Sequence, residues 1–146
     1  MKIRRAKKEE VNKISKIISV LDTKHYKFSK KDKIKTVNIT DLTAQIQFRK
    51  MVYFDLDDLF DFVVTSEEAG ANKPSAKPFE LALKKVNIDA NDIWIIGDDP
   101  ISDIAGGTAF NMKTLQIKHD KTPLSQDADF VFYDFNSLHS TYCKLR

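Results

Sequence analysis

Short apolar runs alternate with amphipathic stretches along most of this chain. From residue 35 onward the apolar runs are rich in β-branched and aromatic residues, and between them apolar residues recur at helical spacing. This alternation predicts an α/β fold with a mostly parallel sheet. The predicted strands cover residues 35–40, 60–66, 92–97, 113–117 and 130–133, and the predicted helices cover residues 42–52, 77–87, 101–110 and 136–144.

The helix predicted over residues 77–87 has a clear start. Ser75 is a suitable N-cap residue, and Pro78 lies in the first turn, where its missing N–H does no harm. We expect the apolar face of this helix to pack on the sheet. We also expect Trp94, in an apolar strand, to lie in the core, and Gly106 and Gly107 to allow close helix packing.

The first 35 residues differ in charge from the rest. They hold 13 Lys or Arg against 4 Asp or Glu, a net charge of +9, whereas residues 36–146 carry −6. Residues 8–21 place apolar side chains along one stripe of a predicted helix. We therefore divide the chain into a basic helical N-terminal segment, 1–34, and a core domain, 35–146. The basic segment lacks interleaved aromatic residues and is followed by no nucleic-acid motif, so nucleic-acid binding is not expected.

Composition narrows the class of protein further. The length of 146 residues fits one domain, and 42% hydrophobic with 31% charged residues is typical of a globular chain. Cys143 is the single cysteine, so a disulfide within the chain is excluded and a reducing cytoplasm is expected. No apolar run reaches the roughly 18 residues of a membrane span, so no membrane partner is expected.

Polar residues cluster just after the predicted strands. In open α/β sheets ligands bind at the carboxyl ends of the strands, so these clusters are candidate site residues. They are Thr40-Asp41, Thr65-Ser66-Glu67, Lys73, and Asp98-Asp99 with Asp103.

The acidic cluster has two interpretations. Asp98, Asp99 and Asp103 follow an apolar strand that ends in Gly97, and carboxylates so placed often bind Mg²⁺. The same acids could instead cap the next helix. Lys73 could neutralise a phosphate or be a surface lysine, and Thr40 could donate to a phosphate oxygen or cap a helix.

In combination these residues resemble the C-terminal half of the haloacid dehalogenase superfamily of hydrolases. NITDLTAQIQFRK resembles its second motif, with Thr40 at the phosphate-binding position; Lys73 matches the lysine of the third motif; and Asp98 with Asp103 matches the fourth. The resemblance covers residues 35–118. It implies a Rossmann-like three-layer α/β sandwich and Mg²⁺-dependent phosphoryl transfer through an aspartyl intermediate, with a phosphorylated small molecule as substrate. Thr40 and Lys73 would be catalytic and phosphate-binding, and Asp98, Asp99 and Asp103 would face the metal.

The family's nucleophile, an Asp-x-Asp pair after the first strand, has no counterpart upstream of Thr40. Asp55-Leu56-Asp57 mimics it, but only 15 residues separate Asp57 from Lys73, too few for the second motif's strand and helix. We interpret Asp55 and Asp57 as part of a turn. The resemblance thus implies a truncated core that lacks the first strand and the cap domain.

Two consequences follow from a missing first strand. In the family it lies between the second-motif and fourth-motif strands, so we predict either that residues 35–40 and 92–97 pair directly or that another chain fills the slot. Exposed strand edges favour a homo-oligomer or a complementing chain. The predicted function is a phosphatase-type hydrolase that is inactive alone; the alternative is a non-catalytic binding module derived from the same fold.

Overall fold

The computed structural model describes residues 35–134 and 136–138. The predicted helix at residues 8–21, the whole of segment 1–34, Cys143 and most of the predicted helix at 136–144 lie outside the described residues. The elements in chain order are β1 (Val37–Thr40), α2 (Ala44–Tyr53), η1 (Asp57–Leu59), β2 (Phe62–Thr65), α3 (Ser66–Ala69), α4 (Ala76–Val86), η2 (Ala90–Asp92), β3 (Trp94–Gly97), η3 (Pro100–Ala105), α5 (Gly106–Ala109), β4 (Lys113–Ile117) and β5 (Phe130–Phe132).

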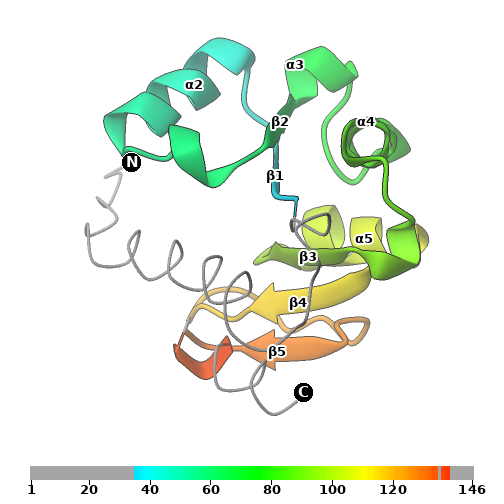
Figure 1. The fold of residues 1–146 in the computed structure, drawn as a ribbon. Coiled ribbons are helices and arrows are strands. Elements are labelled where there is room, and N and C mark those ends of the chain that lie inside the picture. The colour runs from blue at the N-terminus through cyan, green and yellow to red at the C-terminus, as the bar shows by residue number, and fades with distance from the viewer. Residues whose placement is uncertain (1–34, 135, 139–146) are drawn as a thin grey trace, which may run out of the picture.

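All strand pairing among these residues is parallel, in two separate sheets. One sheet contains β1 and β2, with Val37 opposite Phe62 and Thr40 opposite Thr65. The other has the order β3-β4-β5 (Figure 1), with β4 in the centre. The predicted α/β class with parallel strands is therefore confirmed.

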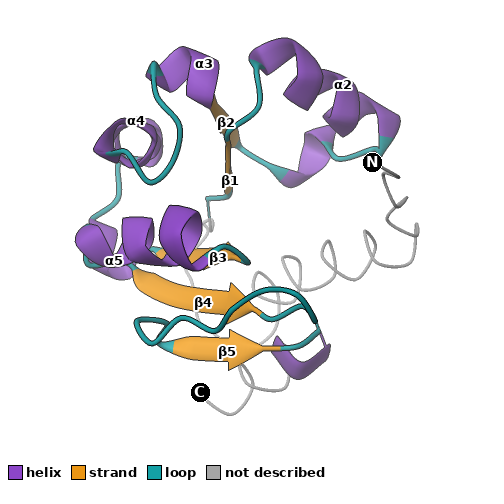
Figure 2. Cartoon of the chain, turned by 180° about the vertical axis from the view of Figure 1, so that it is seen from behind, coloured by secondary structure: helices purple, strands orange, loops and turns teal. Residues whose placement is uncertain are grey.

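The helix layer connects the two sheets. Helix α4 packs on β1 and β2 and also contacts α5, which lies along the three-stranded sheet (Figure 2). As predicted, Ser75 is the residue before α4, although its side chain makes no capping hydrogen bond. Phe79 of α4 is fully buried, and its ring stacks on Phe110 with a centroid distance of 5.6 Å.

Close packing at two glycines keeps these layers together. A Cβ atom on Gly106 would meet the ring of Phe79 at 2.3 Å, and one on Gly107 would meet Ile95 at 2.4 Å. The predicted role of both glycines in close helix packing is therefore confirmed. The helix predicted over residues 101–110 is present, but its first part, η3, is a π-helix.

Two predictions about the sheet are wrong. Trp94 is not in the core, because 45% of its surface is exposed; it shares a face of β3 with Ile96, which is 49% exposed. Alternate residues of a strand point to opposite faces, and the described residues do not cover this face at these two positions. Direct pairing of β1 with β3 is also wrong: within residues 35–134 and 136–138 each pairs only with a strand of its own sheet.

No helix within the described residues has the length and apolarity that crossing a membrane requires.

Candidate active site

The carboxyl ends of β1 and β2 are joined by side-chain hydrogen bonds. Ser66, at the end of β2, donates its hydroxyl to the backbone oxygen of Asp41 at 3.0 Å. Asp41 follows the last residue of β1. Glu67 also reaches across, because its carboxylate accepts the backbone N–H of Ala44 at the start of α2, at 2.9 Å. The polar residues that follow these two strands, Asp41, Ser66 and Glu67, are therefore joined by hydrogen bonds into one rim.

Lys73 connects this rim to the polar residues that follow β3. Its ammonium Nζ lies 2.6 Å from Oδ1 of Asp103, and each side chain is only 12% exposed. Its backbone N–H donates to Oδ1 of Asp41 at 2.8 Å. Lys73 therefore contacts one carboxylate that follows a strand of the first sheet, Asp41, and one that follows a strand of the second sheet, Asp103.

The position of Lys73 is set by its local sequence. It follows the short helix α3, which ends at Gly70 with a left-handed φ of 71°, a conformation that glycine adopts without strain. The Lys73–Pro74 peptide bond is cis. Helix α4 begins three residues after Lys73, at Ala76. The lysine thus lies in a short connection between two helices at the carboxyl edge of the sheets.

Asp103 is a buried polar residue, 8% exposed, in η3. Besides Lys73 it binds the backbone N–H of Asp99, which donates to Oδ2 at 3.2 Å. Gly97 makes room for it, since a Cβ atom on Gly97 would lie 2.3 Å from the Asp103 side chain. A buried carboxylate needs such partners, because an unpaired charge in a low-dielectric site is costly.

Asp99 caps the helix that begins at Pro100. Its Oδ1 accepts the backbone N–H of Ile101 at 2.8 Å and that of Ser102 at 2.7 Å. The pKa of Asp99 lies below its ordinary value, mainly because the backbone N–H of Ser102 stabilises the ionised form. Partial burial opposes this lowering. The N–H of Ile101 and the positive charge of Lys73 lower the pKa further. This arrangement matches the capping interpretation of Asp99.

Asp98 is the acid of this cluster whose carboxylate no other described residue engages. It is exposed, and its side chain makes no hydrogen bond or ion pair with any other described residue. Its backbone oxygen accepts a hydrogen bond from Nε2 of Gln116 at 3.1 Å. Its carboxylate is therefore available for a ligand outside the described residues.

Gln116 is a site residue that the sequence analysis missed. It is fully buried in β4, where Nε2 also donates to the oxygen of Pro123 at 2.8 Å and Oε1 accepts the N–H of Ser125 at 2.9 Å. Its amide thus connects the turn after β3 with the loop after β4. A glutamine between Leu115 and Ile117 in a predicted strand was the available signal.

Thr40 ends β1, and its hydroxyl oxygen accepts the backbone N–H of Leu42 at 3.3 Å. A hydroxyl that accepts one hydrogen bond can still donate its own proton to an oxygen ligand. The helix-capping role considered for Thr40 is wrong, because α2 begins at Ala44 with Thr43 as its N-cap. Donation to a phosphate oxygen stays compatible with this geometry.

Asp55 and Asp57 lie away from this site. They occupy the turn between α2 and β2, at the amino end of β2, whereas Thr65 and Ser66 are at its carboxyl end. Asp55 has a positive φ of 53°, a conformation typical of turn residues. This location agrees with their interpretation as a turn.

A metal ion would need more oxygen ligands than this acidic cluster leaves free. The described residues contain no group of three or more His, Cys, Asp or Glu side chains arranged to bind one. Asp103 is engaged by Lys73 and Asp99 by the helix start, which leaves Asp98. Mg²⁺ commonly binds one or two carboxylates together with waters and substrate phosphates, so Asp98 fits as one ligand of a site completed from elsewhere.

A family model described as haloacid dehalogenase-like hydrolase matches residues 2–117, most of the chain. The chain belongs to the haloacid dehalogenase-like hydrolase family. The match includes every residue of the site described above except the loop at Pro123 and Ser125. It also includes most of the basic segment 1–34.

Curated relatives of this haloacid dehalogenase-like chain include phosphatases. It is 39% identical over 83 residues to the glyceraldehyde 3-phosphate phosphatase of Pyrococcus abyssi, covering 57% of this chain and 35% of that protein. It is 40% identical over 102 residues to the ribulose-1,5-bisphosphate 5-phosphatase of Halopiger xanaduensis, covering 69% of this chain and 43% of that protein. The chain therefore spans less than half the length of these two relatives.

Solved structures of the haloacid dehalogenase type share the fold. The magnesium-bound putative hydrolase YfnB of Bacillus subtilis superposes with a TM-score of 0.74 at 19% identity, covering 90% of this chain and 53% of that one. A phosphatase from Thermococcus onnurineus gives a TM-score of 0.70 at 22% identity, over 75% of this chain and 51% of that one. At these identities the likeness concerns the fold.

Proposed function

We propose that this chain supplies the phosphate-binding and metal-facing part of a Mg²⁺-dependent phosphatase core. The observation that carries the proposal is Lys73, whose backbone binds Asp41 beyond β1 while its ammonium binds Asp103 beyond β3. Phosphoryl transfer depends mainly on positioning and on charge stabilisation, and this arrangement supplies a cation and a set of polar groups at one point.

Each residue has a role in this proposal. Thr40 donates its hydroxyl to an oxygen of the phosphoryl group, and Lys73 stabilises the negative charge on that group and on the attacking carboxylate. Asp103 orients the ammonium of Lys73, and Asp99 fixes the turn that presents Asp98. Asp98 would be a ligand for Mg²⁺, and Asp99 and Asp103 would hold the turn that carries Asp98 so that it faces the metal. Mg²⁺, when bound, would neutralise phosphate oxygens.

The attacking carboxylate comes from outside the described residues. Asp55 and Asp57, the one Asp-x-Asp pair in the printed sequence upstream of Lys73, are at the amino end of β2. Without an attacking oxygen the remaining groups can bind phosphate but cannot form a covalent intermediate. The chain by itself is therefore proposed to be catalytically inactive.

The substrate class is a phosphorylated small molecule. Two of the relatives are phosphatases whose names specify a sugar phosphate or a sugar bisphosphate. Lys73 is the cation of the site, and because Asp98, Asp99 and Asp103 outnumber it, an anionic ligand would need the added charge of Mg²⁺. A cytoplasmic location, where such metabolites occur, belongs to the same proposal.

The test measures binding and turnover separately on the purified chain. We expect binding of inorganic phosphate in the presence of Mg²⁺, measured by isothermal titration calorimetry, and no turnover of p-nitrophenyl phosphate. Lys73→Ala should abolish phosphate binding, whereas Lys77→Ala, which removes an exposed lysine of α4, should not. Absence of phosphate binding would refute the site, and turnover by the chain alone would refute its inactivity.

A second function is a non-catalytic module that binds a phosphorylated ligand or a partner. The pairing of Lys73 with Asp103 favours the partner-binding form of this module, because an ammonium already neutralised at 2.6 Å has less charge to offer any phosphoryl group. The two functions differ once an attacking carboxylate is provided: a phosphatase core then turns over p-nitrophenyl phosphate, and a binding module does not.

A further inference from the structure

The peptide unit between Asp98 and Asp99 is held at both of its polar atoms by buried side chains. Its carbonyl oxygen, on Asp98, accepts a hydrogen bond from Nε2 of Gln116 at 3.1 Å, and its N–H, on Asp99, donates to Oδ2 of Asp103 at 3.2 Å. Gln116 is 0% exposed and Asp103 is 8% exposed. Because a peptide unit is planar, two such bonds fix its orientation and the direction of the backbone on either side.

Asp98 depends on this peptide unit for its position. Its carboxylate makes no hydrogen bond or ion pair with another residue in the described part of the chain, so no side-chain contact there orients it. The direction of its Cα–Cβ bond is then set by its backbone. The hydrogen bonds from Gln116 and to Asp103 therefore determine where the carboxylate of Asp98 is presented.

The side-chain amide of Gln116 is fully used in hydrogen bonds. Its Nε2 carries two N–H groups, which donate to the backbone oxygens of Asp98 and Pro123, and its Oε1 accepts the N–H of Ser125 at 2.9 Å. A carboxamide offers two donors and an acceptor, whereas an ionised carboxylate offers no donor and an aliphatic side chain offers neither. The three bonds therefore depend on the chemistry of glutamine and hold its amide in one orientation.

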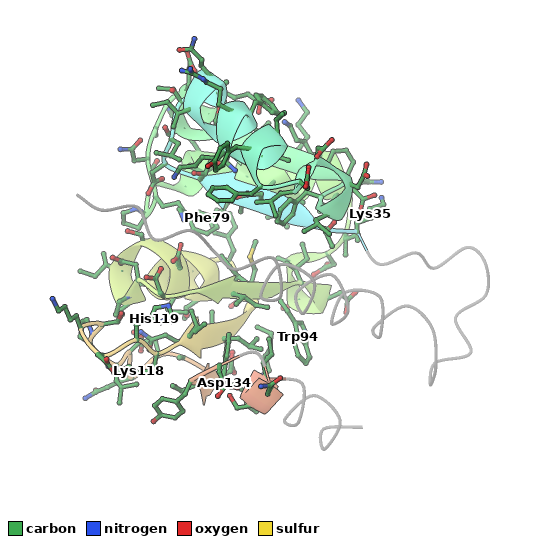
Figure 3. The ribbon with its side chains drawn as sticks, turned by 90° about the vertical axis from the view of Figure 1, so that its left-hand side faces the viewer. Lys35, Phe79, Trp94, Lys118, His119 and Asp134 are labelled. Carbon is green, nitrogen blue, oxygen red and sulfur yellow. The ribbon has the colours of Figure 1, made fainter. Side chains whose placement is uncertain are left out.

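Gln116 lies between the turn after β3 and the loop after β4. In the parallel register of these strands it is opposite Gly97, the last residue of β3. Figure 3 shows Lys118, which follows β4, and Trp94, the first residue of β3, toward opposite sides of the molecule. The loop after β4 therefore begins at the carboxyl ends of the strands, where Asp98 follows β3.

We propose that Gln116 is a positioning residue of the cation site: its amide holds the Asp98–Asp99 peptide so that the carboxylate of Asp98 faces the cation, and it couples this site to the loop after β4. This inference rests on the proposed function for one point, that Asp98 binds a divalent cation. Because one amide binds both segments, cation binding at Asp98 stabilises the hydrogen bond from Ser125, and an ordered loop strengthens cation binding to the same extent.

The experiment titrates the full chain with Mg²⁺ alone and follows the backbone amides by NMR. We expect the amide resonances of Asp98 and Asp99 to shift as the cation binds, and the amide resonance of Ser125 to shift with the same midpoint. Asp98→Ala, which removes the ligand, should abolish all three shifts. This titration needs no change at Gln116, so it tests the coupling even if a Gln116 variant does not fold.

Gln116→Leu removes the three hydrogen bonds and keeps a side chain of similar size. We expect it to raise the dissociation constant for Mg²⁺ by about tenfold or more, which is the usual effect of removing a group that orients a metal ligand. The amide of Ser125 should no longer respond to Mg²⁺ in this variant. Circular dichroism checks that the variant is folded at the temperature of the titration.

Thr114→Val is the matched control for a purely structural effect. Thr114 is also a buried polar residue of β4, 1% exposed, and its hydroxyl accepts the N–H of Asp129 at 3.1 Å and donates to the backbone oxygen of Asp127 at 3.2 Å. Both partners precede β5 and so lie at the amino ends of the strands, away from Asp98. The substitution should lower stability, as Gln116→Leu does, but leave the dissociation constant for Mg²⁺ unchanged.

Three outcomes would overturn the role of Gln116 while leaving the proposed function intact. Equal Mg²⁺ affinity of the unaltered chain and folded Gln116→Leu would show that the amide does not position Asp98. An equal loss of affinity in Thr114→Val would reduce the effect to general stability. A Ser125 amide that ignores Mg²⁺ while Asp98 responds would refute the coupling. If Mg²⁺ shifts no amide at Asp98 in the unaltered chain, the proposed function itself fails at its metal ligand, and the positioning role fails with it.

Discussion

The ammonium of Lys73 lies 2.6 Å from a carboxylate oxygen of Asp103, 30 residues further along the chain. The first residue is connected through its backbone to the loop after β1, and the second belongs to the helix after β3. Because the two sheets share no strand pairing among the described residues, this ion pair is one of the direct polar links between them. Its removal should therefore affect stability as well as ligand binding.

Lys73→Ala is expected to lower the free energy of unfolding by about 2 kcal/mol, since it leaves Asp103, a mostly buried carboxylate, without its cation. Urea denaturation followed by circular dichroism measures this loss. Lys77→Ala, on the exposed face of α4, should change the free energy by less than about 0.5 kcal/mol. Equal effects of the two substitutions would show that the ion pair contributes nothing.

Gly97→Ala is expected to disrupt the same ion pair by displacing Asp103 instead of removing Lys73. The added Cβ atom would lie 2.3 Å from the Asp103 side chain, so that side chain must move. We expect a loss of about 1–3 kcal/mol in the free energy of unfolding and a large weakening of phosphate binding. Gly70→Ala is the control, because its Cβ would meet nothing within 4 Å, so that only the cost of its positive φ applies. Unchanged phosphate binding in Gly97→Ala would contradict the proposed role of Asp103.

The stabilisation by Asp99 should depend on pH in a defined direction. Its pKa in the folded chain is below its ordinary value because the backbone N–H groups of Ser102 and Ile101 bind the ionised form. The stabilisation is therefore present above the unfolded pKa of about 3.9 and is lost as the pH falls through the lower folded pKa. Asp99→Ala should cost about 1 kcal/mol at pH 6 and progressively less below pH 4.

The control for that titration is Asp120→Ala, which removes an exposed carboxylate. Its effect on the free energy of unfolding should be small at every pH. A cost of Asp99→Ala that grows as the pH falls would have the wrong sign for a capping carboxylate and would refute this account.

Gln116→Leu is expected to cost about 2 kcal/mol, because the backbone oxygens of Asp98 and Pro123 and the N–H of Ser125 lose their buried partner. Faster amide exchange at Ser125 would locate the effect in the loop after β4. Gln126→Leu, at an exposed position of the same loop, should leave both stability and exchange nearly unchanged. If Gln116→Leu is equally harmless, the amide does not fix the loop.

Asp55→Asn should have no effect on phosphate binding, or on any turnover of p-nitrophenyl phosphate. The reason is its position at the amino end of β2, away from Lys73. Loss of turnover in Asp55→Asn would restore Asp55 as the nucleophile and would require a different arrangement of the chain.

The sequence predicted the elements and the position of the candidate site because both depend on local patterns. All five predicted strands are present, and the acids after β3 and the lysine before α4 lie at strand or helix ends where the pattern placed them. The four-residue helix α3 was not predicted, since it is too short for helical periodicity. Its start at Thr65, whose hydroxyl accepts the N–H of Glu68, was a detectable local signal.

The rest of the site depends on contacts between distant residues, which the pattern does not contain. Asp41 was recognised as polar at a strand end, but its bond to the N–H of Lys73 joins positions 32 residues apart. The buried amide of Gln116 and the exposure of Trp94 are likewise decided by neighbouring segments. An apolar strand sequence leads to burial only where another segment of the protein covers the face of that strand.

Phe79 limits how the two sheets can move. Its buried ring stacks on Phe110 and lies against Gly106, so it joins α4, on the β1–β2 sheet, to the helix on the β3–β4–β5 sheet. Widening the space between β1 and β3 by hinge motion would expose this aromatic pair to water, which is unfavourable. The spacing of the two sheets should therefore change little when the carboxyl-end site around Lys73 binds a ligand.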